Sequence, residues 1–257
     1  MVSPIIEVRD LTAAYGESVI LENVSFDVRR GEVFVILGGS GCGKSTLMKH
    51  LIGLLPPSRG KILIDGGDIH TATRAERAAL LKKFGVMYQG GALFGSMTLE
   101  ENVTLAMEEF TRLPPAARRL VARMKLALVG LERFSGHFPG EVSGGMQKRA
   151  AIARAMALDP EVLFLDEPSA GLDPVTSAGL DDLILSLNKN LGVTFVIVSH
   201  ELASIYAVAD RVIMLDGKTK GIIAEGAPAD LRDNCPDPFV RAFFHRRAPD
   251  APSGGMP

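Results

Sequence analysis

The stretch from Gly38 to Ser45 constrains this 257-residue chain most, because it has the spacing G-x-x-x-x-G-K-[ST]. The apolar run EVFVIL precedes it, and LMKHLIGLL, which has the character of a helix, follows it. A strand, a glycine-rich loop and a helix in this order surround phosphate oxygens with backbone N–H groups. The alternative, a plain glycine-rich turn, is disfavoured by this context. The predicted phosphate loop comprises Gly38, Gly39, Ser40, Gly41, Cys42, Gly43, Lys44, Ser45 and Thr46.

Three side chains of this loop have separate expected roles. Lys44 is expected to reach the β- and γ-phosphates of a nucleotide, and the Ser45 hydroxyl is expected to bind Mg²⁺. Cys42 is expected to be a small filler. The helix that follows adds positive potential at its N-terminus, which favours bound phosphate.

Composition limits the other classes of function. Apolar residues make up 47% of the chain and charged residues 23%, as in ordinary globular proteins. The formal net charge of −2 gives no overall basic field, so a nucleic-acid partner is not expected. Neither a secretion signal nor an apolar run of about 18 to 20 residues, the length that spans a bilayer, is apparent. We therefore expect a cytosolic chain that reaches a membrane only through a partner.

The pattern along the chain predicts alternating strands and helices with a helical insertion. A helix is expected from near Gly43 to the Pro56-Pro57 pair, and helical spacing dominates from Gln89 to about Val142. Strands are expected at 5–11, 24–30, 32–37, 61–65, 84–88, 161–166 and 193–199, followed by a hairpin of 211–215 and 221–226. The runs at 161–166 and 193–199 are almost wholly apolar, which is typical of buried parallel strands.

Polar residues directly follow three of these strands. Asp166 and Glu167 end EVLFLDE, His200 ends VTFVIVSH, and Gln89 follows FGVMY. Ligands of open α/β sheets bind beyond the carboxyl ends of the strands. We expect Asp166 to hold Mg²⁺, Glu167 to polarise the attacking water, and His200 to contact the γ-phosphate. Gln89 could orient water or bind Mg²⁺, although a loop glutamine alone is weak evidence.

A second stretch, EVSGGMQKRAAIARA at 141–155, also has the form of an anion-binding helix N-terminus. Ser143, Gly144 and Gly145 precede the helical run, and a simple helix cap is the alternative. Tyr15 could stack on a base, whereas an aromatic residue beside a turn is more often packing.

Together these motifs resemble the nucleotide-binding subunit of an ATP-binding cassette (ABC) transporter. The matching pieces, between about residues 5 and 225, are in order Tyr15, GGSGCGKS, Gln89, VSGGM, VLFLDE, SAGLD and His200. The resemblance implies an α/β fold: a P-loop NTPase (ABC ATPase) core with a mixed sheet, an N-terminal antiparallel β subdomain and a helical signature subdomain. It implies one domain at 1–245, with about 90–157 as the helical subdomain inserted in the RecA-like core. Residues 246–257 are expected to be a disordered tail.

The resemblance also implies how the two glycine-rich stretches bind ATP together. Tyr15 would stack on adenine, and Gln89 and His200 would sense the γ-phosphate. Ser143, Gly144 and Gly145 would grip ATP bound to the phosphate loop of a second copy. Ser169 to Asp173 would be the D-loop that crosses to that copy, with Asp173 at the nucleotide. The implied ligands are ATP and Mg²⁺, and the implied assembly is a homodimer of ATPase subunits.

Some details are similar to the ATPases of Mla/Mce-type phospholipid transporters. Met146 ends the VSGGM motif, and Gly-Ala-Leu-Phe follows shortly after Gln89. That group implies phospholipid movement between inner and outer membranes, with a permease, a Mce-domain protein and a peripheral place on the cytoplasmic face of the inner membrane. A polar amino-acid or other small-solute importer stays open, as do, with less support, non-transport cassette ATPases and kinases.

A permease needs a surface to contact. The apolar residues Leu93, Phe94, Met97 and Leu99 beside Gln89 are candidates for that surface. Packing within the helical insertion is the alternative for each of them.

Overall fold

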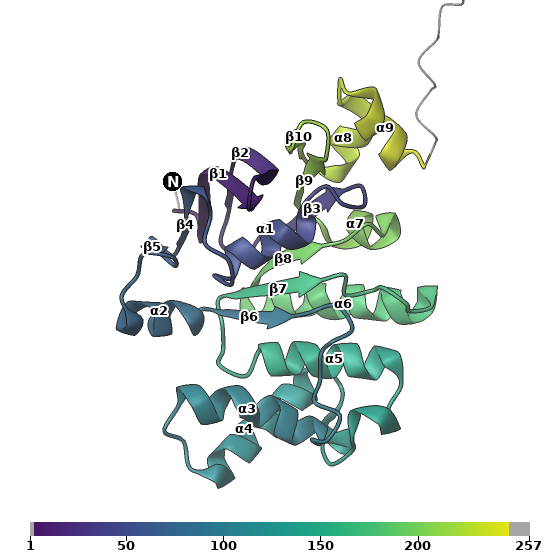
Figure 1. Cartoon of the computed structure of the whole chain (residues 1–257). Coiled ribbons are helices and arrows are strands. Elements are labelled where there is room, and N and C mark those ends of the chain that lie inside the picture. The colour runs from purple at the N-terminus through teal and green to yellow at the C-terminus, as the bar shows by residue number, and fades with distance from the viewer. Residues whose placement is uncertain (1–2, 247–257) are drawn as a thin grey trace, which may run out of the picture.

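The computed structural model describes residues 3–246, which contain two β-sheets with a helix between them (Figure 1). The antiparallel sheet has the strand order β2-β1-β4-β5. Its strands are β1 (Ile6–Tyr15), β2 (Ser18–Val28), β4 (Arg59–Ile64) and β5 (Gly67–Asp68). The other sheet has the order β10-β9-β3-β8-β7-β6, and only β10 runs antiparallel to its neighbour. Its strands are β3 (Val33–Gly38), β6 (Phe84–Met87), β7 (Val162–Asp166), β8 (Thr194–Val198), β9 (Arg211–Asp216) and β10 (Gly221–Gly226).

The first hairpin is longer than the sequence pattern predicts. The expected strands at 5–11 and 24–30 extend toward each other until Tyr15 pairs with Ser18. The register shifts within this pair, and Asp10 (φ 49°) and Asn23 (φ 54°) take left-handed backbone conformations. Such bulges interrupt the alternation of polar and apolar residues by which a strand is recognised in a sequence.

The six-stranded sheet separates two hydrophobic clusters. Along β3, Phe34 and Ile36 face the cluster that includes the antiparallel sheet and helix α1 (Lys44–Leu51). Val33 and Val35 face the opposite cluster, in which the remaining long helices pack. Both faces of the central strands are therefore buried, which explains their nearly unbroken apolar sequences.

Helix α1 ends earlier than predicted. It ends at Leu51 rather than at the proline pair, and the chain continues in turns. Gly53 has φ 74°, and a Cβ there would lie 2.8 Å from Ile69 Cδ1. This left-handed glycine turns the chain before Pro56 can act as a helix breaker.

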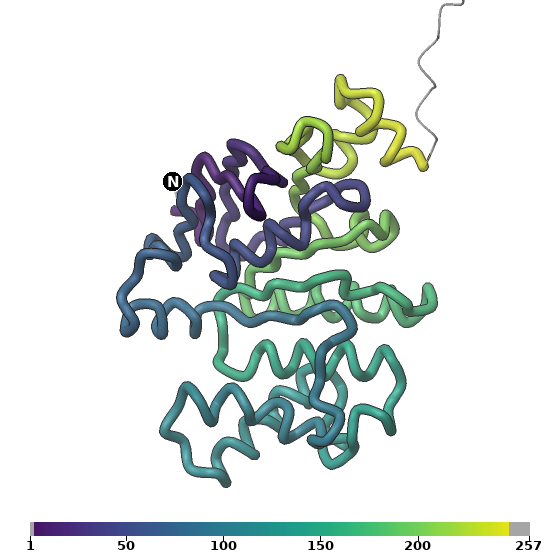
Figure 2. Tube along the Cα trace, viewed as in Figure 1, coloured from purple at the N-terminus to yellow at the C-terminus, as the bar shows by residue number. Residues whose placement is uncertain are grey.

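Three helices of the predicted insertion form the lower lobe of Figures 1 and 2. They are α3 (Leu99–Phe110), α4 (Pro115–Leu128) and α5 (Gly144–Ala155). The chain enters this lobe after β6 and returns through α5 to β7. The further helices are α2 (Arg74–Leu81), α6 (Pro174–Leu191), α7 (Leu202–Val208), α8 (Pro228–Asn234) and α9 (Pro238–Phe244). Within residues 3–246, no helix is both long and apolar enough to cross a membrane. The expected disordered tail lies outside the described residues from position 247 onward.

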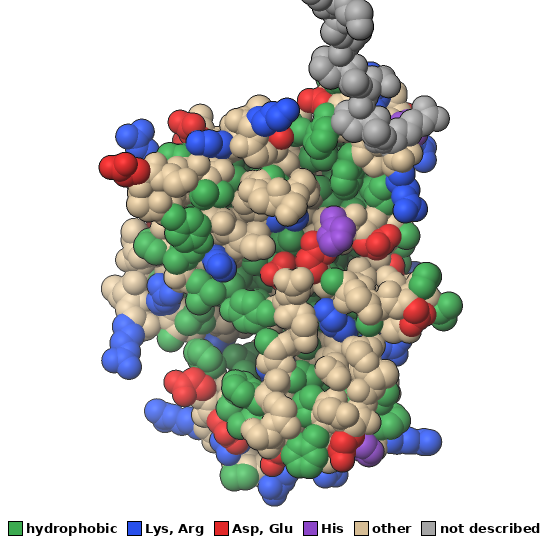
Figure 3. Space-filling model, turned by 45° about the vertical axis from the view of Figure 1, so that its right-hand side comes forward, with side chains coloured by type: hydrophobic (Ala, Val, Ile, Leu, Met, Phe, Trp, Pro, Cys, Tyr) green, Lys and Arg blue, Asp and Glu red, His purple; other side chains and the backbone are tan. Residues whose placement is uncertain are grey.

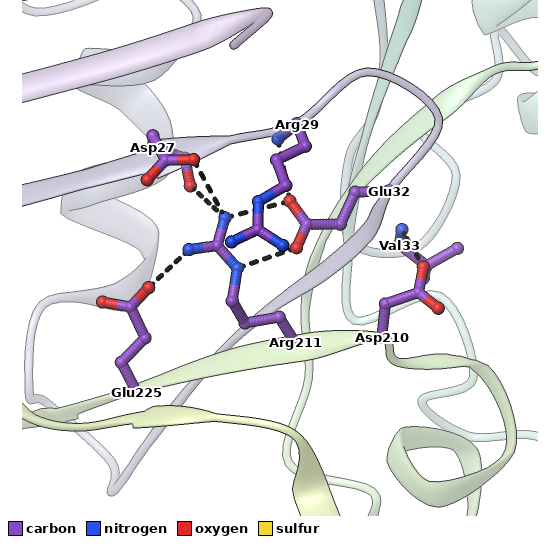
Figure 4. Close-up of polar contacts among 7 residues, drawn as sticks. All are labelled: Asp27, Arg29, Glu32, Val33, Asp210, Arg211 and Glu225. Carbon is purple, nitrogen blue, oxygen red and sulfur yellow. Dashed lines mark hydrogen bonds and ion pairs between the residues drawn. The ribbon is translucent and has the colours of Figure 1, made fainter. Parts of the chain in front are cut away.

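Arg211, at the start of β9, joins the two sheets (Figure 4). Its guanidinium donates to both carboxylate oxygens of Glu32, at 2.7 and 3.0 Å, and to the backbone oxygen of Asp27 at 2.7 Å. It also pairs with Glu225 and lies 5.0 Å from the ring centre of Phe34. Because Arg211 and Glu32 are 12% and 6% exposed, they form a buried, bidentate ion pair.

Replacing Arg211 with methionine is expected to lower the free energy of unfolding by about 3–5 kcal/mol, because Glu32 would keep a buried charge without a partner. Urea denaturation measures this change. Arg232→Met is the matched control, since its pair with Asp233 is exposed and contributes little to stability. Equal losses in the two variants would contradict the importance of burial.

Candidate nucleotide site

The loop between β3 and α1 requires glycine at its two ends. Gly38 has φ 148°, and a Cβ there would lie 2.4 Å from Cys42 Sγ and 2.5 Å from the Leu215 oxygen. Gly43 has φ 103°, and a Cβ there would lie 2.8 Å from Leu21 Cδ2. Packing against β9 and β2 thus fixes both ends of the loop.

The middle of the loop is open. Gly39 and Gly41 are exposed, and a Cβ on either would meet nothing within 4 Å. The Lys44 side chain folds over the loop, and its Nζ donates to the backbone oxygens of Gly38 and Gly39 at 2.8 and 2.9 Å. Burial raises the pKa of the Cys42 thiol, so this thiol is neutral and serves as a filler. An exposed glycine loop with a cation above it, at the start of a helix, has the form of a phosphate-binding loop.

The predicted polar residues lie along one edge of the six-stranded sheet. Gln89 follows β6, Asp166 ends β7, and His200 follows β8. These strands run parallel to β3, so their carboxyl ends share an edge with the phosphate loop. Figure 3 shows a histidine beside several acidic side chains on this face. The fold therefore brings together four segments that are up to about 160 residues apart in the sequence.

The two adjacent carboxylates, Asp166 and Glu167, are half-buried. Burial, and then the neighbouring charge of Glu167, raise the pKa of Asp166. The cations of Lys148 and Lys44 act in the opposite direction. A cation bound at this edge would favour the charged form of Asp166.

Glu167 is tethered at every polar group. Its backbone N–H donates to the backbone oxygen of Val198 at 2.8 Å, and its backbone oxygen accepts from the N–H of Ala170 at 3.2 Å. Its side-chain Oε1 lies 2.8 Å from His200 Nδ1, and the His200 side chain is 65% exposed. The backbone of Glu167 has φ 48°, a left-handed conformation that is unusual for glutamate.

The oxygen donors at this edge suit Mg²⁺. Ser45 offers a hydroxyl in the first turn of α1, Asp166 a carboxylate and Gln89 an amide oxygen. Among residues 3–246, no cluster of three His, Cys, Asp or Glu side chains could enclose a metal. Magnesium needs no such cluster when it is held by one carboxylate, a hydroxyl and substrate phosphates. The residues present therefore fit an ion that binds with a nucleotide.

The Ser143 segment lies elsewhere in the molecule. Ser143 is the N-cap of α5 and accepts from Met146 N at 3.3 Å. Ser143 and Gly144 are exposed, and none of the hydrogen bonds among residues 3–246 connects 143–145 with 38–46. Within one copy, the structure does not bring the two glycine-rich stretches together.

Packing against α6 requires a glycine at position 145. A Cβ there would lie 2.4 Å from Thr176 Cγ2. Thr176 in turn contacts Asp173, which is the N-cap of α6 and accepts from the backbone N–H groups of Val175 and Thr176 at 3.0 Å. Asp173 therefore has a capping role in this copy. Tyr15 ends β1 and is 48% exposed, so its ring is not core packing.

Sequence reasoning missed three cations of α5 that contact three separate segments of the chain. Lys148 Nζ donates to Glu167 O at 3.4 Å, and Arg149 donates to Gly179 O at 3.3 Å. Arg154 donates to the oxygens of Gly91 and Ala92 at 2.8 and 2.7 Å. The letters QKRAAIARA show that cations are present, but only the tertiary structure shows which of them turn inward.

An apolar groove of about 530 Å³ separates the sheet from the lower lobe. It is lined by Tyr88, Phe94, Leu105, Phe110, Arg154 and Leu158, among others. Figure 3 shows mostly hydrophobic side chains around a hollow at this boundary. Of the four residues expected at a partner surface, Phe94 lines the groove and is 50% exposed. The prediction that Leu99 belongs to that surface is wrong, because Leu99 begins α3 and is fully buried in the core.

Asn102 shapes one wall of this groove from inside. Its side chain is fully buried, accepts from Phe94 N at 2.8 Å, and donates to the oxygens of Phe94, Met97 and Thr98 at 3.0 to 3.1 Å. The loop before α3 is thus held by four hydrogen bonds to one side chain.

Comparison with known families explains this arrangement. The family model described as "ABC transporter" matches residues 21–170, more than half of the chain. The chain belongs to the ABC transporter family. Its phosphate loop, mixed sheet and helical lobe are those of an ABC ATPase.

Individual relatives of this ABC ATPase cover most of its length. The "probable ribonucleotide transport ATP-binding protein mkl" of Mycobacterium leprae is 44% identical over 242 residues, which are 94% of this chain and 69% of the relative. The "intermembrane phospholipid transport system ATP-binding protein MlaF" of Escherichia coli K12 is 40% identical over 243 residues, 95% of this chain and 89% of the relative. A solved dimer of the ATP-binding cassette MJ0796, bound to ADP and Pi in a post-hydrolysis state, has a TM-score of 0.77 and 31% identity. The match covers 86% of this chain and 98% of that one.

Proposed function

We propose that this ABC ATPase powers phospholipid transport between inner and outer membranes from the cytoplasmic face of the inner membrane. The main support for a phospholipid substrate is the 40% identity to MlaF over 95% of the chain. Met146 and the Gly-Ala-Leu-Phe loop, similar to the Mla/Mce group, support it. The proposed partners are a permease and a Mce-domain protein.

The proposed reaction is hydrolysis of ATP at the sheet edge. The amides of the phosphate loop and Lys44 bind the phosphates, and the exposed ring of Tyr15 stacks on adenine. Glu167 accepts the proton of the attacking water, while His200 holds the carboxylate and contacts the γ-phosphate. Ser45, Gln89 and Asp166 hold Mg²⁺, which neutralises phosphate charge when it is bound.

Two copies are proposed to complete each site. Ser143 and Gly144 are exposed at the N-terminus of α5, and Gly145 is buried directly behind them. Within the part of the chain that the structure describes, no hydrogen bond joins this segment to the phosphate loop of its own copy, so its exposed end can serve the nucleotide of a second copy. The MJ0796 cassette, which is dimeric with ADP and Pi, supports a homodimer. We propose that the two copies pair head to tail and that the 169–173 loop of each copy reaches across to the other. ATP that contacts both copies favours the closed pair, and hydrolysis removes that bridge.

The apolar groove beside Gln89 is proposed to receive the permease. Phe94→Asp is expected to abolish co-purification of the membrane partners, because a charge would replace apolar contact in the groove. Hydrolysis by the isolated ATPase should stay close to wild type, which phosphate release measures. Leu120→Asp is the matched control: Leu120 is 63% exposed on α4, outside the groove. Loss of partners in both variants, or in neither, would contradict docking in the groove.

A second candidate substrate, a ribonucleotide, is favoured by the name of the Mycobacterium leprae relative. One experiment separates the two candidates. The tagged chain is purified from its own cells with its membrane partners, and the bound molecules are identified by mass spectrometry. Bound phospholipid that an acceptor vesicle receives only in the presence of ATP supports the proposal. A solute-binding partner carrying a nucleotide would replace it with the second candidate. The Lys44→Ala chain, purified in the same way, should keep its partners and lose the ATP-dependent transfer.

A further inference from the structure

Lys148 is a buried cation to which none of the motifs above assigns a role. It lies in the second turn of α5 and is 6% exposed. Lysine is almost never buried without a partner, since removing its ammonium from water is costly. What this ammonium contacts therefore indicates why it is there.

The partner is the turn that carries Glu167. Lys148 Nζ donates to Glu167 O at 3.4 Å, and the charges acting on Lys148 are the carboxylates of Asp166 and Glu167. Burial lowers the pKa of Lys148, and both carboxylates oppose that shift. The ammonium thus approaches the turn from the side of the lower lobe.

Glu167 needs such support because its backbone is in an unusual conformation. A glutamate at φ 48° persists only where its surroundings hold it. Val198 and Ala170 hold the peptide groups of Glu167 from the sheet and from the following loop. Lys148 adds a third hold, from the helix whose N-cap is Ser143.

We propose that Lys148 is a positioning residue, which uses its buried ammonium to fix the Glu167 turn to the Ser143 helix in the geometry needed for hydrolysis. This inference rests on the proposed role of Glu167 as the base. In a head-to-tail pair, Ser143 would contact the partner's nucleotide while Glu167 serves the nucleotide of its own copy. Lys148 would then tie together parts of two different sites.

The test compares Lys148→Met with Lys125→Met in the full chain. Lys125 is an equally buried lysine, 7% exposed, which pairs with Asp159 on a different surface. In Lys148→Met we expect kcat to fall about tenfold or more, since small displacements of a catalytic group are costly. The Kd for a fluorescent ATP analogue should change less than about twofold, because no phosphate contact is lost. Lys125→Met should leave both quantities near wild type.

A measurement without nucleotide provides the second readout. Amide hydrogen exchange at residues 167–172 should be about fivefold faster or more in Lys148→Met, and unchanged in Lys125→Met. Lys148→Arg, which keeps a cationic donor, should restore much of kcat, whereas the shorter, neutral Lys148→Gln should not. The Gln variant also decides the question if Lys148→Met does not fold.

Three outcomes would overturn the inference: an unchanged kcat, a loss of kcat matched by an equal loss of nucleotide affinity, or unchanged exchange at 167–172. Failure of the proposed function has a different signature. If Glu167→Gln hydrolyses ATP normally, Glu167 is not the base. The exchange comparison, which needs no nucleotide, then still decides whether Lys148 holds the turn.

Discussion

Glu167→Gln is expected to lower the rate of ATP hydrolysis by about a thousandfold, because glutamine cannot accept a proton from the attacking water. Binding of ATP should be retained, since the phosphate loop and Lys44 are untouched. ATP that binds but is not cleaved should hold two copies together. Phosphate release measures the first effect, and light scattering with and without ATP measures the second.

Glu161→Gln is the matched control for that experiment. Glu161 directly precedes β7, at the opposite end of the strand from Glu167, and forms exposed pairs with Arg30 and Lys83. Its loss should leave hydrolysis within about twofold of wild type, since such pairs contribute little. A Glu167→Gln protein that hydrolyses ATP normally and stays monomeric would exclude Glu167 as the base.

Lys44→Ala is expected to raise the Kd for ATP by about 10- to 100-fold, since hydrogen bonds from a cation to a charged group contribute about 1.5–3 kcal/mol. Hydrolysis should fall with the loss of binding. Equilibrium titration with a fluorescent ATP analogue measures the affinity. Lys49→Ala, an exposed lysine in the last turn of the same helix, should bind ATP as wild type does.

Mixing Lys44→Ala with Ser143→Arg subunits extends this experiment to the proposed composite site. In a mixed pair both lesions fall on one interface, and the other interface is intact. Part of the activity should therefore return on mixing two inactive proteins. No return of activity would count against two independently working shared sites.

The sequence predicted much of the sheet because its central strands are buried on both faces. The apolar runs at 161–166 and 193–199 became β7 and β8 almost residue for residue. The phosphate loop was predictable because glycine and lysine occupy fixed places in it. Such local patterns need no knowledge of the rest of the molecule.

Features that depend on contacts between distant segments were not predictable. Leu99 belongs to an apolar stretch that was predicted to contact a partner, yet helix α3 places its side chain in the core. The sequence pattern assigns Lys148 to a solvated helix face, and only the tertiary structure shows that it is buried beside Glu167. In the first hairpin, the bulges near Asp10 and Asn23 conceal strand residues from any test for alternation.

The hydrogen bonds of Asn102 have a consequence for the kinetics of assembly. Because one buried side chain holds the loop around Phe94, we expect that wall of the groove to be ordered before a partner binds. A partner that docks there does not have to order the loop, so the entropic cost of association is reduced. Binding in the groove should then resemble the docking of two preformed surfaces. Differences in affinity between partners should arise mainly from their dissociation rates.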